Sequence, residues 1–145
     1  MLRNDFVKDV QCDIFQVIYM DELYKEHILD HYRNPRNKHA LAKCDIKQDG
    51  SNPSCGDTLV LYVLFDDSGR VKEASFEGSG CAISQAGASL FTEKIKGMTQ
   101  KELEKMPYGL LSIPISPARE LCALLAYHAL KEGLVQYNNQ KNKSV

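Results

Sequence analysis

The sequence predicts an α+β fold in which a three-stranded antiparallel sheet carries helices on one face. Residues 58–65 and 71–76 are rich in β-branched and aromatic residues, and a turn signal at 66–69 joins them as a hairpin. Residues 44–48 form a short edge strand before them. Helical periodicity on both sides of this segment supplies the helices that cover one face of the meander.

Length and composition indicate one globular domain. The chain has 145 residues, 43% apolar and 26% charged, with a formal net charge of -1. This balance gives no electrostatic reason to expect nucleic acid or an anionic membrane as partner. No window is apolar enough for a membrane helix, and the N-terminus lacks the pattern of a secretion signal. We therefore expect a cytoplasmic protein whose partners are proteins or small molecules.

Periodicity and polarity divide the chain into three parts. Residues 1–19 form an N-terminal extension that is expected to be helical, because its apolar positions fit one stripe. The domain covers residues 20–137, and residues 138–145 are a polar tail.

Start and stop signals place the helices of the domain. A helix over 21–32 is stopped by Asn34-Pro35. A second begins near Cys81, with Ser79 as its cap, and ends near Lys96. Thr99 and Glu102 form the capping box of a short helix, which ends near residue 105. The last helix starts at Ser116-Pro117 and runs to about residue 137, with a core stripe of leucines at 121, 124, 125 and 130.

The five cysteines are an odd number and lack the dense spacing of a secreted disulfide scaffold, and in a reducing compartment such cysteines favour metal binding or thiol chemistry. Cys12, in the extension, is better explained as a free cysteine than as a ligand. His27 and His31 stand four apart on one helical face, the spacing of a metal pair. Because no glutamate or third ligand accompanies them, we expect these histidines to pack or to lie at the surface.

Four potential ligands come from three separate segments. Cys55 and Asp57 flank a glycine. They follow the exposed turn expected at 49–53 and precede a strand. Cys81 follows a glycine loop at a helix start, where the positive helix end favours the thiolate. Cys122 lies in the last helix. Three thiolates and a carboxylate suit tetrahedral zinc, and thiolates equally suit iron-sulfur clusters.

Three ordered motifs and the first helix resemble one family. The motifs are NPSCGD at 52–57, GSGCAIS at 78–84 and RELC at 119–122 followed by ALLAY. Residues 23–37 are similar to the first helix and turn of that family. The chain is thus identified from about residue 20 to 137 as a member of the iron-sulfur cluster assembly scaffold family of IscU, SufU and the N-terminal domain of NifU.

The resemblance implies that Cys55, Asp57, Cys81 and Cys122 hold a transient [2Fe-2S] or [4Fe-4S] cluster, with Cys122 as the candidate sulfur acceptor. Sulfur would come from a pyridoxal-phosphate-dependent cysteine desulfurase, and the cluster would pass to acceptor proteins. Family members often hold zinc at the same ligands. The implied fold is the antiparallel sheet with helices on one face.

Departures from the family pattern favour a SufU-like member of the SUF system. IscU-type members have a histidine immediately before the last cysteine and an LPPVK chaperone motif upstream, whereas this chain has Leu121 and IPISP at 113–117. Arg119, three positions before Cys122, resembles SufU and would support the site. The segment between Cys81 and Cys122 lacks the insertion usual in SufU, so its loop is shortened.

Three functions remain open from the sequence. The first is the scaffold, with Asp57 as the labile oxygen ligand. The second is a zinc-bound sulfur acceptor that activates a desulfurase and carries no cluster. The third is a structural zinc module, which the apolar periodicity disfavours because a chain of this length folds without metal.

Overall fold

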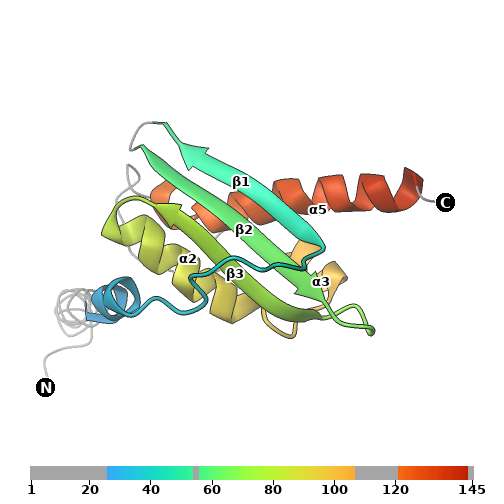
Figure 1. The fold of residues 1–145 in the computed structure, drawn as a ribbon, viewed down its shortest axis with the longest axis horizontal. Coiled ribbons are helices and arrows are strands. Elements are labelled where there is room, and N and C mark those ends of the chain that lie inside the picture. Colours follow the sequence, from blue (N-terminus) through green and yellow to red (C-terminus); the bar gives the residue numbers. More distant parts are fainter. Residues whose placement is uncertain (1–25, 54–55, 107–120, 144–145) are drawn as a thin grey trace, which may run out of the picture.

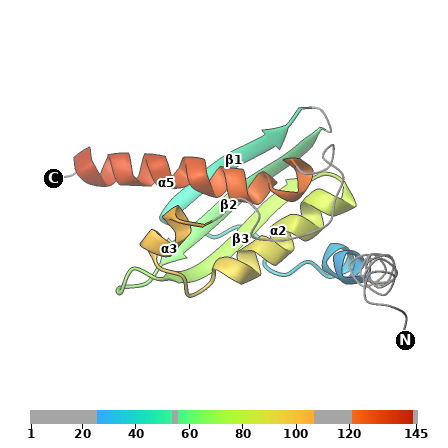
Figure 2. The same ribbon diagram turned by 180° about the vertical axis from the view of Figure 1, so that it is seen from behind.

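A computed structural model of the chain describes residues 26–53, 56–106 and 121–143. The expected extension 1–19, Cys12, Cys55 and Arg119 lie outside these ranges. The described part is an α+β domain with one three-stranded sheet, and helices cover one face of it (Figures 1 and 2). The predicted fold class is confirmed.

The sheet is an antiparallel meander in the order β1-β2-β3. Its strands are β1 (Ile46–Asn52), β2 (Asp57–Phe65) and β3 (Val71–Ser79). The predicted hairpin turn joins β2 to β3, where Gly69 adopts a φ of 86°. This left-handed conformation is one that glycine reaches without strain. The sequence therefore located β2 and the β2–β3 turn closely.

The first strand differs from the expectation. The predicted strand was 44–48 and the predicted loop 49–53, whereas β1 runs from Ile46 to Asn52 and pairs with β2 along its whole length. Pairing overrides the turn propensity of these residues, because strand preference depends on context. A Cβ at Gly50 would lie 3.4 Å from the Cβ of Ala129, an ordinary van der Waals distance from the helix behind the strand.

The described residues contain four helical segments. Residues 26–33 are helical and end before Pro35, as predicted. The others are α2 (Ala82–Ile95), α3 (Gln100–Glu104) and α5 (Leu125–Lys143), the last preceded by a helical turn at 121–123. The capping box of Thr99 and Glu102 is confirmed at α3.

Two expectations for the last helix need correction. It continues to Lys143 rather than ending near residue 137, so polar residues after 137 extend the helix. Leu121, predicted to be in the core stripe, is 51% exposed, whereas Leu124, Leu125 and Leu130 are buried. A turn at residue 124 separates the helical residues 121–123 from α5. The start predicted at 116–117 lies outside the described residues.

The core lies between the sheet and the helices α2 and α5 (Figure 2). Leu61 and Phe76 from the sheet meet Phe91 of α2 and Leu130 of α5, and all four are fully buried. Full burial of a side chain of this kind contributes about 1.5–3 kcal/mol. This packing of helices on the sheet fixes the positions of the ends of β2, α2 and the last helix relative to one another.

The opposite face of the sheet is crossed by the segment 36–45 (Figure 1). Its carbonyl at Asn37 accepts a hydrogen bond from the Phe76 amide at 2.9 Å, and the Asp45 amide donates to Val63 O at 2.8 Å. The segment therefore links the free edge of β3 to the start of β1.

His31 packs and His27 lies at the surface, the two roles that the sequence favoured over a metal pair. Their rings meet edge to face with centroids 4.7 Å apart. His31 is buried, with Nδ1 2.7 Å from Ser89 Oγ, and burial is the main cause that lowers its pKa below the usual value. The contact between His31 and Ser89 joins the first helix to α2.

Among the described residues, no helix is both long enough and apolar enough to span a membrane.

Candidate metal centre

The site begins at the turn end of the β1–β2 hairpin. Asn52 and Asp57 are its last cross-strand pair, and the Gly56 amide donates to Asn52 O at 2.9 Å. Gly56 has a φ of 72°, which lets the chain reverse between the two strands. Residues directly opposite in an antiparallel pair share a face of the sheet. Asn52 and Asp57 are both buried, 5% and 1% exposed, so the hairpin end directs two polar side chains inward.

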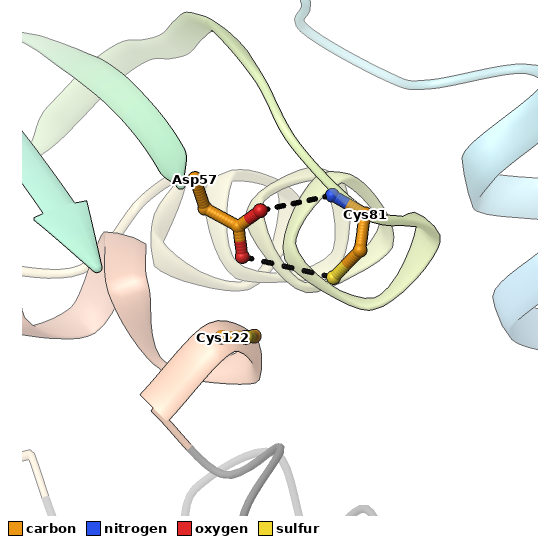
Figure 3. A group of neighbouring side chains, drawn as sticks. All are labelled: Asp57, Cys81 and Cys122. Carbon is orange, nitrogen blue, oxygen red and sulfur yellow. Dashed lines mark hydrogen bonds between the residues drawn. The ribbon is translucent and has the colours of Figure 1, made fainter. Parts of the chain in front are cut away.

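Cys81 lies beside Asp57 because β3 delivers the chain to the start of α2. One carboxylate oxygen of Asp57, Oδ1, accepts a hydrogen bond from the Cys81 amide at 3.0 Å (Figure 3). The other, Oδ2, lies 3.7 Å from Cys81 Sγ. The amide fixes the orientation of the carboxylate, so that Oδ2 is presented to the sulfur. The structure thereby uses a free helix N–H to position an oxygen ligand.

The glycine before Cys81 is required by this arrangement. A Cβ at residue 80 would collide with Asp57 Oδ1 and lie 2.6 Å from Ser84 Oγ. The cap of α2 differs from the prediction: Ser79 ends β3, and Cys81 itself is the N-cap, without a side-chain capping bond. Because β3 continues to Ser79, its pairing with Thr58 carries the chain closer to the helix start than the sequence indicated.

Cys122 reaches the same point from the last helical region. It is fully buried, and its sulfur accepts a hydrogen bond from Asn52 Nδ2 at 3.3 Å. Gly87 permits the approach of α2, since a Cβ there would lie 2.5 Å from the carbonyl oxygen of Ala123. A small residue on α2 therefore sets how near the Cys122 turn comes to Asp57 and Cys81.

One ligand atom from each of Asp57, Cys81 and Cys122 lies within 4.8 Å of the others (Figure 3). Two sulfurs and one oxygen are a donor set that suits zinc, which takes four such ligands in a tetrahedron. Thiolate donors equally suit iron-sulfur centres. The residues present therefore fit either a zinc ion or a cluster, and the carboxylate already has the orientation that a ligand needs.

The structure brings together three of the four predicted ligands. Cys55 and Arg119 lie outside the described residues, so their places remain predictions. Cys44 lies before β1, at the opposite end of that strand from Asn52, and burial raises the pKa of its thiol. Sequence reasoning missed Asn52, because its loop was not expected to pair with β2. The signal that would have found it is the strand register, which places residue 52 opposite residue 57.

Fold and site together define a small α+β domain that gathers two cysteines and an aspartate, a candidate metal-binding group, at one end of its sheet. The family model of the NifU-like N terminal domain matches residues 23–144. The chain belongs to this family, as its sequence motifs indicated.

Two relatives show the range of functions in the family. The chain is 38% identical over 138 residues to the zinc-dependent sulfurtransferase SufU of Bacillus subtilis, covering 81% of this chain and 92% of the relative. It is 38% identical over 132 residues to the iron-sulfur cluster assembly scaffold protein IscU of Thermotoga maritima, covering 77% and 92%.

Solved structures agree on the fold. A proposed iron-sulfur cluster assembly scaffold protein for the SUF system from Fervidobacterium islandicum has a TM-score of 0.64 and 29% identity, covering 75% of this chain and 94% of that one. The N-terminal NifU-like protein of Brucella abortus, at 23% identity, has a TM-score of 0.65 over 83% of this chain and 97% of its own. This second likeness shows the fold alone.

Proposed function

We propose that this protein is a scaffold on which an iron-sulfur cluster is assembled from iron and from sulfur that a cysteine desulfurase supplies. The convergence of Asp57, Cys81 and Cys122 within 4.8 Å carries the proposal, because these donors bind soft metals and come from separate elements that the fold fixes. The names of its relatives support the same role. The cluster is cargo, which the protein passes to acceptor proteins.

Cys122 is the proposed sulfur acceptor. Its thiolate attacks the terminal sulfur of the desulfurase persulfide, a new S–S bond forms at Cys122, and the desulfurase thiolate leaves. The step needs no external oxidant, because the persulfide sulfur is already oxidised. Cys122 is buried whereas Cys81 is half-buried, so the partner must open the site before this attack. Exchange of a weakly held ligand is the simplest way to open it.

Asp57 is the ligand suited to that exchange. A carboxylate oxygen holds a soft centre less firmly than a thiolate does. We therefore expect Asp57→Ala to give a reconstituted cluster that lasts longer than the wild-type cluster, measured as the decay of visible absorbance after anaerobic loading. A shorter lifetime in the variant contradicts this role.

A second function is favoured by the donor set and by the zinc-dependent relative. In it, zinc holds the cysteines as thiolates until the desulfurase displaces one ligand, and no cluster forms. Anaerobic reconstitution with iron, cysteine and a desulfurase separates the two. Visible cluster bands support the scaffold; their absence, together with faster desulfurase turnover and stoichiometric zinc in protein purified without oxygen, supports the acceptor.

Several finer assignments complete the proposal. Cys55 is the proposed fourth ligand, and Arg119 supports the site in a SufU-like member. The scaffold domain spans residues 20–137, preceded by an extension at 1–19 and followed by a polar segment at 138–145. We place the protein in the cytoplasm, where its thiols stay reduced. Its reaction partner is then a cytoplasmic desulfurase.

A further inference from the structure

Asn52 is a buried amide that touches the proposed site without being one of its ligands. Its Nδ2 atom lies 3.3 Å from Cys122 Sγ, although the two residues are 70 positions apart in the sequence. Asparagine is uncommon in strands, and burying its amide costs free energy unless it is hydrogen-bonded. Strand formation therefore does not by itself explain an asparagine at the last β1–β2 pair.

The hairpin end contacts both cysteines. Asn52 and Asp57 are cross-strand partners. Asp57 accepts a hydrogen bond from the Cys81 amide, and Asn52 donates one to the Cys122 sulfur. The backbone of Asn52 also closes the turn through Gly56. One rigid strand end therefore sets the position of a sulfur on α2 and of a sulfur on the last helical region.

The chemistry of the acceptor indicates what this contact does. A thiol sulfur is a weak hydrogen-bond acceptor, whereas hydrogen bonds to an ionised acceptor are stronger and shorter. The Asn52 amide is therefore better satisfied when Cys122 is a metal-bound thiolate than when it is a thiol. A residue that only filled space would have no such preference.

Resting on the proposed function, we infer that Asn52 is a positioning residue of the centre, whose amide N–H holds the Cys122 sulfur toward Asp57 and Cys81 and stabilises it in the metal-bound state. Groups that hydrogen-bond to metal ligands typically change metal affinity by about 10–100-fold when they are removed. Hydrogen bonds to cluster sulfurs also tune the electronic properties of the centre.

The test uses Co²⁺ as a spectroscopic probe on the full chain. Asn52→Leu keeps a similar volume and removes the donor. We expect its Co²⁺ affinity, measured by competition with a chelator, to fall about 10–100-fold. We also expect the sulfur-to-cobalt charge-transfer band to move to lower energy, because a sulfur without the N–H bond gives up its electrons more easily. The matched control is Ser51→Ala, at an exposed neighbour on the same strand.

A second variant covers the case in which leucine prevents folding. Asn52→Ser has a polar side chain that is one bond shorter, so its hydroxyl no longer reaches Cys122 Sγ, and it should shift affinity and band in the same direction. Circular dichroism of the metal-free proteins checks the fold. Affinity and band energy equal to those of wild type in the folded variants would overturn the inference and leave the proposed function intact. A wild-type chain that binds no Co²⁺ would instead overturn the proposed metal centre itself, and the inference with it.

Discussion

The two ends of strand β2 each carry an aspartate beside a turn, and the two aspartates are used in opposite ways. At the β2–β3 turn, Asp66 Oδ1 accepts hydrogen bonds from the Ser68 amide at 2.9 Å, the Ser68 hydroxyl at 2.7 Å and the Arg70 amide at 3.0 Å. Every partner lies within four residues, and Asp66 is exposed. Its carboxylate serves the turn that contains it.

At the other end, Asp57 is buried and its partner comes from another element. The Cys81 amide lies 24 positions away, and the sulfurs of Cys81 and Cys122 are the remaining neighbours. The comparison shows that residue type and a turn context do not distinguish a structural carboxylate from a functional one. Burial together with partners from distant segments does, because the fold must bring those partners together.

The largest expected effect separates Cys81, in the site, from Cys44, which lies just before β1. Cys81→Ser should weaken Zn²⁺ binding by about 100-fold or more, since loss of a ligand exceeds the 10–100-fold loss usual for an outer partner. Cys44→Ser makes the same substitution just before β1, at the end of that strand away from the site, and should leave Zn²⁺ binding unaltered. Competition with a chromophoric chelator measures both. Equal affinities for the two variants would place the metal elsewhere.

The next effect tests the close approach of α2 to the Cys122 turn. Gly87→Ala places a Cβ 2.5 Å from the Ala123 carbonyl oxygen, a backbone atom that cannot swing away. Overpacking of this kind costs about 1–3 kcal/mol, against a gain of about 1 kcal/mol in helix propensity. We expect lower stability in denaturant unfolding together with weaker Zn²⁺ binding.

Gly133→Ala is the matched control for that change. Its Cβ would meet Ile46 Cγ2 at 2.6 Å and Gln48 Cβ at 3.3 Å, which are side-chain atoms at the end of the sheet remote from Cys122. Any change in stability here comes from local repacking of these side chains, and Zn²⁺ affinity should stay at the wild-type value. If Gly87→Ala binds zinc as wild type does, the spacing of α2 does not set the site.

A smaller effect is expected at the N-terminus of α3, away from the site. Thr99 accepts a hydrogen bond from the Glu102 amide at 3.2 Å, and Glu102 Oε1 accepts one from the Thr99 amide at 2.9 Å. Thr99→Ala should reduce the free energy of unfolding by about 1 kcal/mol. Zinc affinity should not change, and Thr99→Ser, which keeps the hydroxyl, should retain most of the stability. A change in affinity would show that the two ends are coupled.

The smallest effect, on thermal stability, is expected from a substitution of Asp66. Hydrogen bonds from Ser68, and then from the Arg70 amide, lower the pKa of Asp66 below its ordinary value of 3.8. A carboxyl group with a lowered pKa stabilises the folded state at pH values above its pKa in the unfolded chain. This contribution is lost as the pH falls through its pKa in the folded state. Asp66→Asn should therefore melt slightly below wild type near neutral pH, and the difference should shrink below pH 3.8. A difference that does not depend on pH would contradict this account.

Local signals predicted the elements whose causes are local. The capping box at Thr99 and Glu102, the turn at Gly69 and the stop at Pro35 depend on neighbours a few residues away, so spacing reveals them. The extent of β1 and the exposure of Leu121 were predicted wrongly. The first depends on pairing with β2, and the second concerns a residue that a turn at residue 124 separates from α5.

The sequence by itself determined the fold class and the chemistry: thiols and a carboxylate placed at a turn, a helix start and a helix. It also determined the candidate ligands Asp57, Cys81 and Cys122, because their motifs resemble those of the family. Only the tertiary structure decided that the Cys81 amide orients Asp57 and that Asn52 reaches Cys122. These contacts join residues that are 24 and 70 positions apart in the sequence. Strand register and helix packing bring such residues together, and neither can be recognised from the periodicity of the sequence.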